Sequence, residues 1–150
     1  MGADARVPRG APRLSGAGDP EVGRRAERTF HVDDGAIEAF AAVSGDRNPV
    51  HLDDAYAATT RFGGRVAHGM LTAAYFSSLL AGELPGPGSV YLGQRLRFTA
   101  PVRPGDDVRC EVAVTAWDGA RRRATLSTRA WVGDTLVVDG EATVLAPAPE

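Results

Sequence analysis

A carboxylate, a carboxamide and an imidazole stand close together in the segment SGDRNPVH, residues 44–51. A carboxylate and an imidazole aimed at one point can hold a water molecule and move its protons, which is general acid–base chemistry. Asp46 and His51 would supply this pair, and the amide of Asn48 would fix its geometry. Pro49 predicts a loop here and not a helix, because the residue before a proline avoids the α region. The alternative is an ordinary turn with a packed histidine, since Gly-Asp and Asn-Pro are common turn formers.

A second candidate site is the segment His68-Gly69-Met70, which opens a predicted helix. The first N–H groups of a helix have no acceptor within it and lie at the positive end of its dipole. The Gly69 N–H would therefore bind a carbonyl oxygen that develops negative charge, and glycine would let that oxygen approach closely. The alternative is that Gly69 only eases a tight helix start while His68 caps or packs. Ser77 is either a pocket hydroxyl or a serine bonded back to a helix carbonyl.

The helix that would position Gly69 is predicted over residues 69–81, and it is apolar around most of its circumference. Such a helix is typically buried. An earlier helix is predicted after Asp33 or Asp34, either of which can cap it, and Gly45 would end it. Two shorter elements are also predicted in this half of the chain, a strand over residues 29–32 and a helical piece over residues 53–58.

After residue 90 the apolar residues recur with a period of two, which indicates half-buried strands. Asp118-Gly119 is a strong hairpin signal between two of them. Helices that precede an antiparallel meander indicate the α+β class, with a curved sheet wrapped around the long buried helix. The predicted strands cover residues 91–100, 108–116, 124–132 and 135–145.

Composition excludes several classes of protein. The chain has 150 residues and a formal net charge of -2, which suits a single domain and argues against a polyanion binder. No apolar run approaches the ~20 residues of a membrane span, and the start of the chain lacks the apolar core of a secretory signal. The single cysteine, Cys110, excludes a disulfide within the chain, so we expect a cytoplasmic protein. Lysine is absent, which excludes Schiff-base chemistry on a lysine.

Residues 1–28 differ from the rest because they lack aromatic residues and are rich in Gly, Pro, Ala and Arg. Such a stretch cannot bury enough apolar surface to offset its ordering entropy, so we expect a disordered N-terminal arm. The folded domain is predicted over residues 29–147.

The two candidate segments together carry a family likeness. The motif Gly-Asp-Arg-Asn-Pro-Val-His, followed by His-Gly-Met at the start of a buried helix, resembles the MaoC-like hydratase family. This hot-dog-fold group contains the R-specific enoyl-CoA hydratases, including single-domain members that supply polyhydroxyalkanoate synthesis. The likeness covers residues 30–145 and extends to Phe62, Phe76-Ser77, Tyr91-Leu92-Gly93-Gln94, Phe98, Pro101-Val102, Gly105-Asp106 and Gly140-Glu141-Ala142.

The resemblance implies a hot-dog fold and the reversible hydration of a trans-2-enoyl-CoA to an (R)-3-hydroxyacyl-CoA. In this scheme Asp46 and His51 hold the water, with His51 as the base and Asp46 as the orienting group and proton donor. Asn48 would support the pair, and the Gly69 N–H would bind the thioester carbonyl. Neither a metal nor an organic cofactor is implied. The implied substrate-binding residues are Phe62, His68, Met70, Ser77 and Leu80, and the pair Gly63-Gly64 departs from the bulkier residues expected near the pocket mouth.

The same resemblance implies the partners of the chain. The substrate would be an acyl-CoA thioester, with an acyl-carrier-protein thioester as the related option. The chain would form a homodimer, which would also cover an exposed sheet edge. Nearby candidates to meet the pantetheine phosphates are Arg61, Arg65, Arg95 and Arg97.

Other functions remain open at this level. The same residues would serve a (3R)-hydroxyacyl-carrier-protein dehydratase of fatty-acid or polyketide synthesis. A hot-dog thioesterase usually carries its carboxylate on the central helix, which here has no acid before Glu83. A non-catalytic acyl-thioester binder would not need the complete set of catalytic residues. Nucleic-acid binding would rest on Arg121-Arg122-Arg123, a run that also suits a solvated turn.

Overall fold

The last three strands form the antiparallel meander that the period of two predicts, and the first two strands add to its edges. The computed structural model describes residues 19–149. The order in the sheet is β1-β3-β4-β5-β2. The strands are β1 (Arg25–Val32), β2 (Val90–Phe98), β3 (Asp106–Asp118), β4 (Arg123–Val132) and β5 (Thr135–Leu145).

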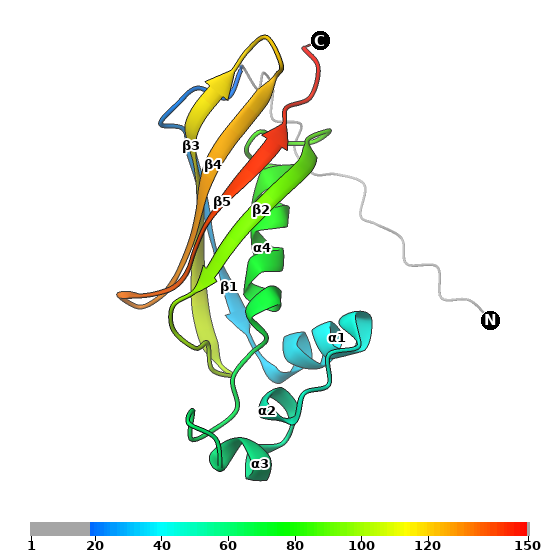
Figure 1. Cartoon of the computed structure of the whole chain (residues 1–150), viewed down its shortest axis with the longest axis vertical. Coiled ribbons are helices and arrows are strands. Elements are labelled where there is room, and N and C mark those ends of the chain that lie inside the picture. The colour runs from blue at the N-terminus through cyan, green and yellow to red at the C-terminus, as the bar shows by residue number, and fades with distance from the viewer. Residues whose placement is uncertain (1–18, 150) are drawn as a thin grey trace, which may run out of the picture.

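The sheet curves around one long helix, and the shorter helices gather at one end of it (Figure 1). The helices are α1 (Asp34–Ser44), α2 (Pro49–Leu52), α3 (Asp54–Ala58) and α4 (Gly69–Gly82). This is the α+β class and the hot-dog arrangement that the resemblance implied. Among the helices of residues 19–149, none is long and apolar enough to cross a membrane.

The core lies between α4 and the inner face of the sheet. Alternate residues of β3, Val108, Cys110 and Val112, are completely buried, and so are Phe76 and Leu79 of α4. Burial of apolar side chains of this size contributes about 1.5–3 kcal/mol each. The packing of α4 on the sheet therefore fixes the direction in which the first turn of the helix points.

The apolar composition of α4 predicted a helix buried on nearly every side, but the structure leaves one side exposed. Met70, Ala74, Ser77 and Ala81 lie exposed along one side at helical spacing. Small residues and methionine suit an exposed helix surface as well as a core, so composition alone does not show which side is covered. The exposed residues leave one side of the helix without a neighbour among residues 19–149.

Strand β1 begins at Arg25, before the strand predicted at residue 29, so residues 25–28 belong to the folded domain and not to an arm. Its charged side chains pair with side chains of the neighbouring strand β3, Arg25 with Glu111 at 3.4 Å and Glu27 with Arg109 at 3.0 Å. The low apolar content that predicted disorder is here the property of an edge strand with a solvated side. Residues 19–24 of the predicted arm also contact the sheet, since the Gly23 N–H donates to the Val114 oxygen at 2.9 Å, and residues 1–18 lie outside the described residues.

Local signals set the helix boundaries around the first candidate segment. Gly45 ends α1 in a left-handed conformation, with φ 77°, as expected. The prediction that Pro49 keeps this segment free of helix is wrong. Pro49 is the first residue of α2, a position where the N–H has no acceptor within the helix, so proline costs no hydrogen bond there. The Asn48 side chain caps that helix. His51 therefore lies on a one-turn helix, while Asp46 lies on the loop before it.

Candidate active site

A cleft of about 430 Å³ opens where the short helices meet the start of α4. Both candidate segments reach it, and its ionisable side chains are Asp46, His51, Arg61 and His68. A mostly apolar cleft with a few convergent polar groups is typical of a small-molecule site. The apolar lining includes Phe62, Val66, Met70, Phe98, Val102, Val137 and Val138.

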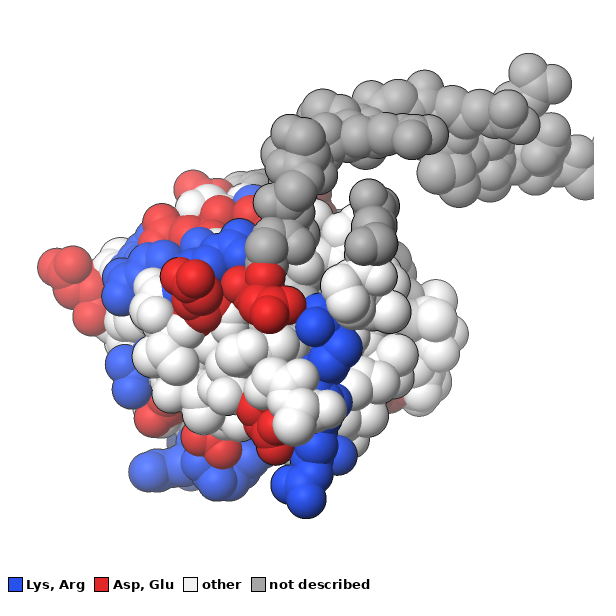
Figure 2. Space-filling model, turned by 90° about the horizontal axis from the view of Figure 1, so that it is seen from above, with Lys and Arg blue, Asp and Glu red and all other residues white. Residues whose placement is uncertain are grey.

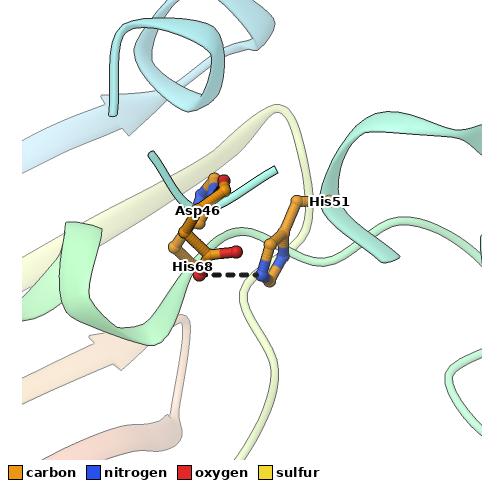
Figure 3. A group of neighbouring side chains, drawn as sticks. All are labelled: Asp46, His51 and His68. Atoms are coloured by element: carbon orange, nitrogen blue, oxygen red, sulfur yellow. Dashed lines mark hydrogen bonds and ion pairs between the residues drawn. The ribbon is translucent and has the colours of Figure 1, made fainter. Parts of the chain in front are cut away.

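The Nε2 atom of His51 lies 3.9 Å from Oδ2 of Asp46 (Figure 3). This is longer than a hydrogen bond, so the two groups face each other across a gap. The Asp46 side chain is 50% exposed and the His51 side chain only 11%. The other carboxylate oxygen, Oδ1, accepts a hydrogen bond from the Asn48 N–H at 3.1 Å. Oδ2 therefore remains available on the side of His51.

The tautomer of neutral His51 follows from its second nitrogen. Nδ1 lies 2.7 Å from the backbone oxygen of Val66. A carbonyl oxygen only accepts, so Nδ1 carries the hydrogen and donates it. Nε2 of the neutral ring is therefore a lone-pair acceptor, and it faces Asp46.

Residues 65–68 hold residues 46–51 in place, although they come later in the chain. Backbone and side-chain groups both take part, so the loop and the one-turn helix are fixed together. The hydrogen bonds run from the Val66 N–H to the Val50 oxygen (3.2 Å), from His51 Nδ1 to the Val66 oxygen (2.7 Å), from Arg65 Nη1 to the His51 oxygen (3.4 Å) and from His68 Nε2 to the Asp46 oxygen (2.9 Å).

His68 is packed between two other rings and is only 2% exposed. Its ring centroid lies 3.9 Å from that of His51 and 4.9 Å from that of Phe40. As the N-cap residue of α4 it makes no side-chain cap hydrogen bond. Of the two alternatives for this residue, capping and packing, the structure therefore favours packing.

Gly69 is the first residue of α4 and lines the cleft, so its N–H has no acceptor within the helix. A side chain at this position would collide with a ring of β2, because a Cβ would lie 2.7 Å from Cε1 of Phe98. Any side chain here would therefore have to displace the Phe98 ring, and glycine instead leaves a backbone donor beside the cleft.

A family model described as "MaoC like domain" matches residues 17–140. This chain belongs to the MaoC-like domain family. It is 50% identical over 128 residues to the (R)-specific enoyl-CoA hydratase of Aeromonas caviae, across 85% of this chain and 96% of that relative.

Two further MaoC-like comparisons concern a solved structure and a more distant relative. The unliganded R-hydratase of Pseudomonas aeruginosa superposes with a TM-score of 0.81 at 52% identity, covering 86% of this chain and 83% of that one. A mitochondrial 3-hydroxyacyl-[acyl-carrier-protein] dehydratase of Arabidopsis thaliana is 35% identical over 127 residues, across 82% of this chain and 74% of that relative.

Six of the site residues predicted for this MaoC-like chain line the cleft, namely Asp46, His51, Phe62, His68, Gly69 and Met70. The other three do not line it. Asn48 is exposed and acts on its neighbours, since its N–H binds Asp46 and its side chain accepts from the Val50 N–H at 3.2 Å. Ser77 is exposed on α4, and Leu80 is buried in the core.

Of the four arginines proposed to meet phosphates, only Arg61 lines the cleft of this MaoC-like chain. Its guanidinium lies over the Phe62 ring, 4.9 Å from the centroid. Arg65 is committed elsewhere, to Asp54 at 2.7 Å and Asp34 at 2.9 Å. The hydrogen bonds that Arg65 donates to these two carboxylates, chiefly to Asp54, raise the pKa of Arg65 above its ordinary value. The other two arginines lie on β2, outside the lining.

Arg103 holds the loop of residues 62–64 at the mouth of the cleft by hydrogen bonds to its backbone. No pattern in the sequence predicts this role. Its Nη2 donates to the Phe62 oxygen at 2.6 Å and its Nη1 to the Gly64 oxygen at 3.1 Å. Every basic residue of the chain is an arginine, so type alone does not distinguish this one. The Gly63-Gly64 loop is therefore held by a side chain from another part of the chain.

The donor set suits acid–base chemistry better than a metal centre. One ligand atom from each of Asp46, His51 and His68 lies within 4.8 Å of the other two. However, His51 Nδ1 and His68 Nε2 are engaged with backbone carbonyls. His68 Nδ1 is buried, which leaves one carboxylate and one imidazole nitrogen beside the cleft. A catalytic zinc site uses three protein ligands.

Two of the alternative functions find little support in the MaoC-like fold. Helix α4 contains no acidic residue for a thioesterase. In the arginine run, Arg121 lies 3.6 Å from Asp118 and Arg122 lies 3.1 Å from Asp19. Arginine and acidic side chains are interspersed on the face of the molecule shown in Figure 2. This run is therefore part of a mixed-charge surface.

Proposed function

We propose that this chain hydrates trans-2-enoyl-CoA thioesters to (R)-3-hydroxyacyl-CoA and catalyses the reverse dehydration. The proposal rests on the two acceptors that face each other beside the cleft, Asp46 Oδ2 and His51 Nε2, 3.9 Å apart. A water molecule that donates one hydrogen to each fits this gap, since O–H donors sit about 2.8 Å from their acceptors. The Aeromonas relative, which is named an (R)-specific enoyl-CoA hydratase, supports the reaction and its stereochemistry.

The first turn of α4 would bind the other reacting group. The Gly69 N–H donates to the thioester carbonyl, and the helix dipole adds to this attraction as negative charge develops on the oxygen. Asp46 orients the water. The water oxygen bonds to C3 while His51 Nε2 accepts one of the water protons. His51 Nε2 then gives this proton to C2 from the same side, as the enolate electrons form the C2–H bond and the carbonyl is restored. The protons balance, and the neutral Nε2 is restored.

The apolar lining would hold the acyl chain beyond C3. Phe62, Met70 and Phe98 come from three separate segments and surround the cleft. Arg61 is the cationic side chain in the lining, so it would lie nearest to the phosphates of the carrier. Chain-length preference would then follow from the apolar residues and not from the catalytic pair.

The direct test is the loss of enoyl-thioester absorbance when the purified protein is mixed with crotonyl-CoA. The wild type should convert it to the R-3-hydroxy product, identified by chiral chromatography after thioester hydrolysis. Asp46→Asn and His51→Ala should each lower kcat by about 100-fold or more, because general acid–base catalysis contributes on this scale. Circular dichroism would check that both variants fold.

An inactive wild type, tested also with longer and branched enoyl-CoA chains, would contradict the proposal. Formation of the S product would contradict the stereochemical part. Full activity of both variants would show that water is activated by other residues.

A carrier-protein thioester is the second candidate substrate. It is favoured by the likeness to the Arabidopsis protein named as an acyl-carrier-protein dehydratase. The discriminating measurement is kcat/KM for crotonyl-CoA against the same acyl group on acyl carrier protein. A higher value with CoA supports the first proposal, and a higher value with the carrier protein supports the second.

We also infer that the active form is a homodimer. Two surfaces of the single chain are apolar and exposed. One is the side of α4 that carries Met70 and Ala74, and the other is the edge strand β2, where Val90, Tyr91 and Leu92 are 50%, 39% and 46% exposed. An open strand edge offers unpaired backbone groups to a second strand, so a second copy of this chain suits both surfaces.

A further inference from the structure

His68 is the buried centre of the catalytic group, although the family likeness places it among the substrate-binding residues. We propose that His68 is a positioning residue that holds both Asp46 and His51 and does not itself contact the substrate. The inference rests on the proposed hydratase function, because it assigns how that pair is kept in place. Three observations support it: the engagement of its nitrogens, its hydrogen bond to Asp46 and its contact with the ring of His51.

Neither nitrogen of His68 is available to a substrate. Nε2 lies 2.9 Å from the backbone oxygen of Asp46, and a carbonyl oxygen only accepts, so Nε2 carries the hydrogen. Nδ1 is then the lone-pair nitrogen, and it is buried without a hydrogen-bond partner among the described residues. His68 is only 2% exposed, so very little of it is accessible from the cleft that it lines.

The hydrogen bond to Asp46 acts on the peptide that carries the catalytic carboxylate. Asp46 lies on a loop, and its side chain is half exposed. The Asn48 N–H holds one carboxylate oxygen from the same loop. The bond from His68 is the contact that ties this peptide to the start of α4, and so to the Gly69 donor. The distance between the carboxylate and the carbonyl site depends on it.

The ring contact acts on His51. A hydrogen bond at Nδ1 fixes one point of that imidazole, but it leaves the ring free to tilt about the bond. The His68 ring lies against it with centroids 3.9 Å apart and planes 32° apart, which restricts the tilt. Phe40 packs against His68 at 4.9 Å and supports it. One buried side chain therefore sets the relative placement of both acceptors (Figure 3).

Two variants separate the hydrogen bond from the ring. His68→Phe keeps an aromatic ring and removes the donor to Asp46. His68→Gln keeps an amide N–H at the same number of bonds from the backbone as Nε2, and removes the ring. We expect His68→Phe to lower kcat about 10- to 100-fold with KM unchanged, because a small misplacement of catalytic groups costs this much. His68→Gln should recover only part of the loss, because it restores the donor to the Asp46 oxygen but not the ring contact with His51. His31→Phe, the same change at an exposed histidine of β1, is the matched control.

The double variant tests whether His68 acts through Asp46. In the Asp46→Asn background His68→Phe should cause little further loss, because groups that act as a unit are not additive. A full additional loss would overturn the coupling. A rise in KM with kcat unchanged in His68→Phe would assign the residue to substrate binding and overturn the proposal. Wild-type kinetics in the folded His68→Phe protein would do the same.

A second measurement does not depend on activity and keeps this inference separate from the proposed function. The chain has three histidines, so ¹⁵N-labelled imidazole signals can be assigned by single substitutions. We expect opposite tautomers when both rings of this pair are neutral, with hydrogen on Nε2 of His68 and on Nδ1 of His51. Hydrogen on Nδ1 of His68 would overturn the inference even in an active enzyme. An inactive wild type with the expected tautomers would instead contradict the proposed function alone.

Discussion

Gly69 and Phe98 are in direct contact, so closely that a Cβ on Gly69 would lie 2.7 Å from Cε1 and 2.8 Å from Cδ1 of the phenylalanine ring. The contact joins the first residue of α4 to the last residue of β2. Phe98 is 52% exposed, so its ring has space to move away if it is pushed. The donor proposed for the thioester carbonyl is therefore shaped by a ring that also lines the cleft.

Gly69→Ala should fold and lose activity. The new methyl group must displace either the Phe98 ring or the first turn of α4, and either shift misplaces the Gly69 N–H. We expect kcat/KM with the enoyl thioester to fall by about tenfold or more. The double variant Gly69→Ala with Phe98→Leu should regain part of the loss, because the shorter side chain makes room. An equally inactive double variant would show that the methyl group acts on the substrate and not through Phe98.

Arg103→Lys should weaken substrate binding with little change in kcat. An ammonium group cannot reproduce the planar arrangement by which the guanidinium reaches the oxygens of Phe62 and Gly64. The loop that carries Phe62 would then lose its brace, while the Asp46–His51 pair stays in place. Steady-state kinetics should show a higher KM. Arg129→Lys on the outer side of the sheet, where the arginine pairs with Asp139 at 3.1 Å, is the control. A fall in kcat at unchanged KM would contradict the assignment.

Cys110 should resist thiol reagents in the folded protein and weaken the fold at alkaline pH. Burial raises the pKa of the Cys110 thiol to about 12, from an ordinary value of 9.0. The folded state thus keeps the proton that the unfolded state releases. The stabilising effect of the neutral thiol is complete below pH 9 and is lost as the pH rises toward about 12.

Urea unfolding at a series of alkaline pH values would measure this effect. The free energy of unfolding of the wild type should fall with pH more steeply than that of Cys110→Ala, by up to about 1.4 kcal/mol per pH unit. Equal slopes would show that the thiol does not carry the alkaline transition. Reaction with a maleimide at neutral pH should require denaturant.

Ala74→Arg should give a folded monomer if the exposed side of α4 meets a second copy. The alanine lies in the middle of that side, next to Met70, so a long charged side chain would disrupt the packing there. Light scattering after size-exclusion chromatography would report the mass of both proteins. Val43→Arg on α1, where the valine is 83% exposed, is the matched control and should remain a dimer. A monomeric wild type would contradict the homodimer.

The sheet was predictable because its inner face is covered by one helix. On β3, buried and partly exposed residues alternate from Val108 to Val114, and the period of two follows directly from that one-sided burial. The same rule fails where both sides of a strand are covered or both are open. Val137 and Val138 are neighbours on β5 and both are buried and line the cleft, whereas strict alternation would place only one of them inward. On β1, charged side chains that pair with β3 stand where apolar residues would have shown the period of two.

That Asp46 and His51 meet at the cleft was predictable from the sequence, but the local structure of their segment was not. Asp46 and His51 were found from their types and spacing, yet Pro49 was interpreted as a helix breaker when it begins α2. The anchors of the site were missed because they are long-range contacts, such as His68 to Asp46 and Arg103 to the Phe62 loop. No local rule in a sequence reports which backbone carbonyl a distant side chain will reach.

The hydrogen bond that fixes His51 ends on the backbone of Val66 and not on its side chain. Val66 is also one of the apolar residues that line the cleft. Other aliphatic residues at this position would leave the anchor of the imidazole intact while they reshape the space for the acyl chain. If His51 is the base that we propose, the residue that secures it is also one at which substrate preference can change during evolution without loss of activity.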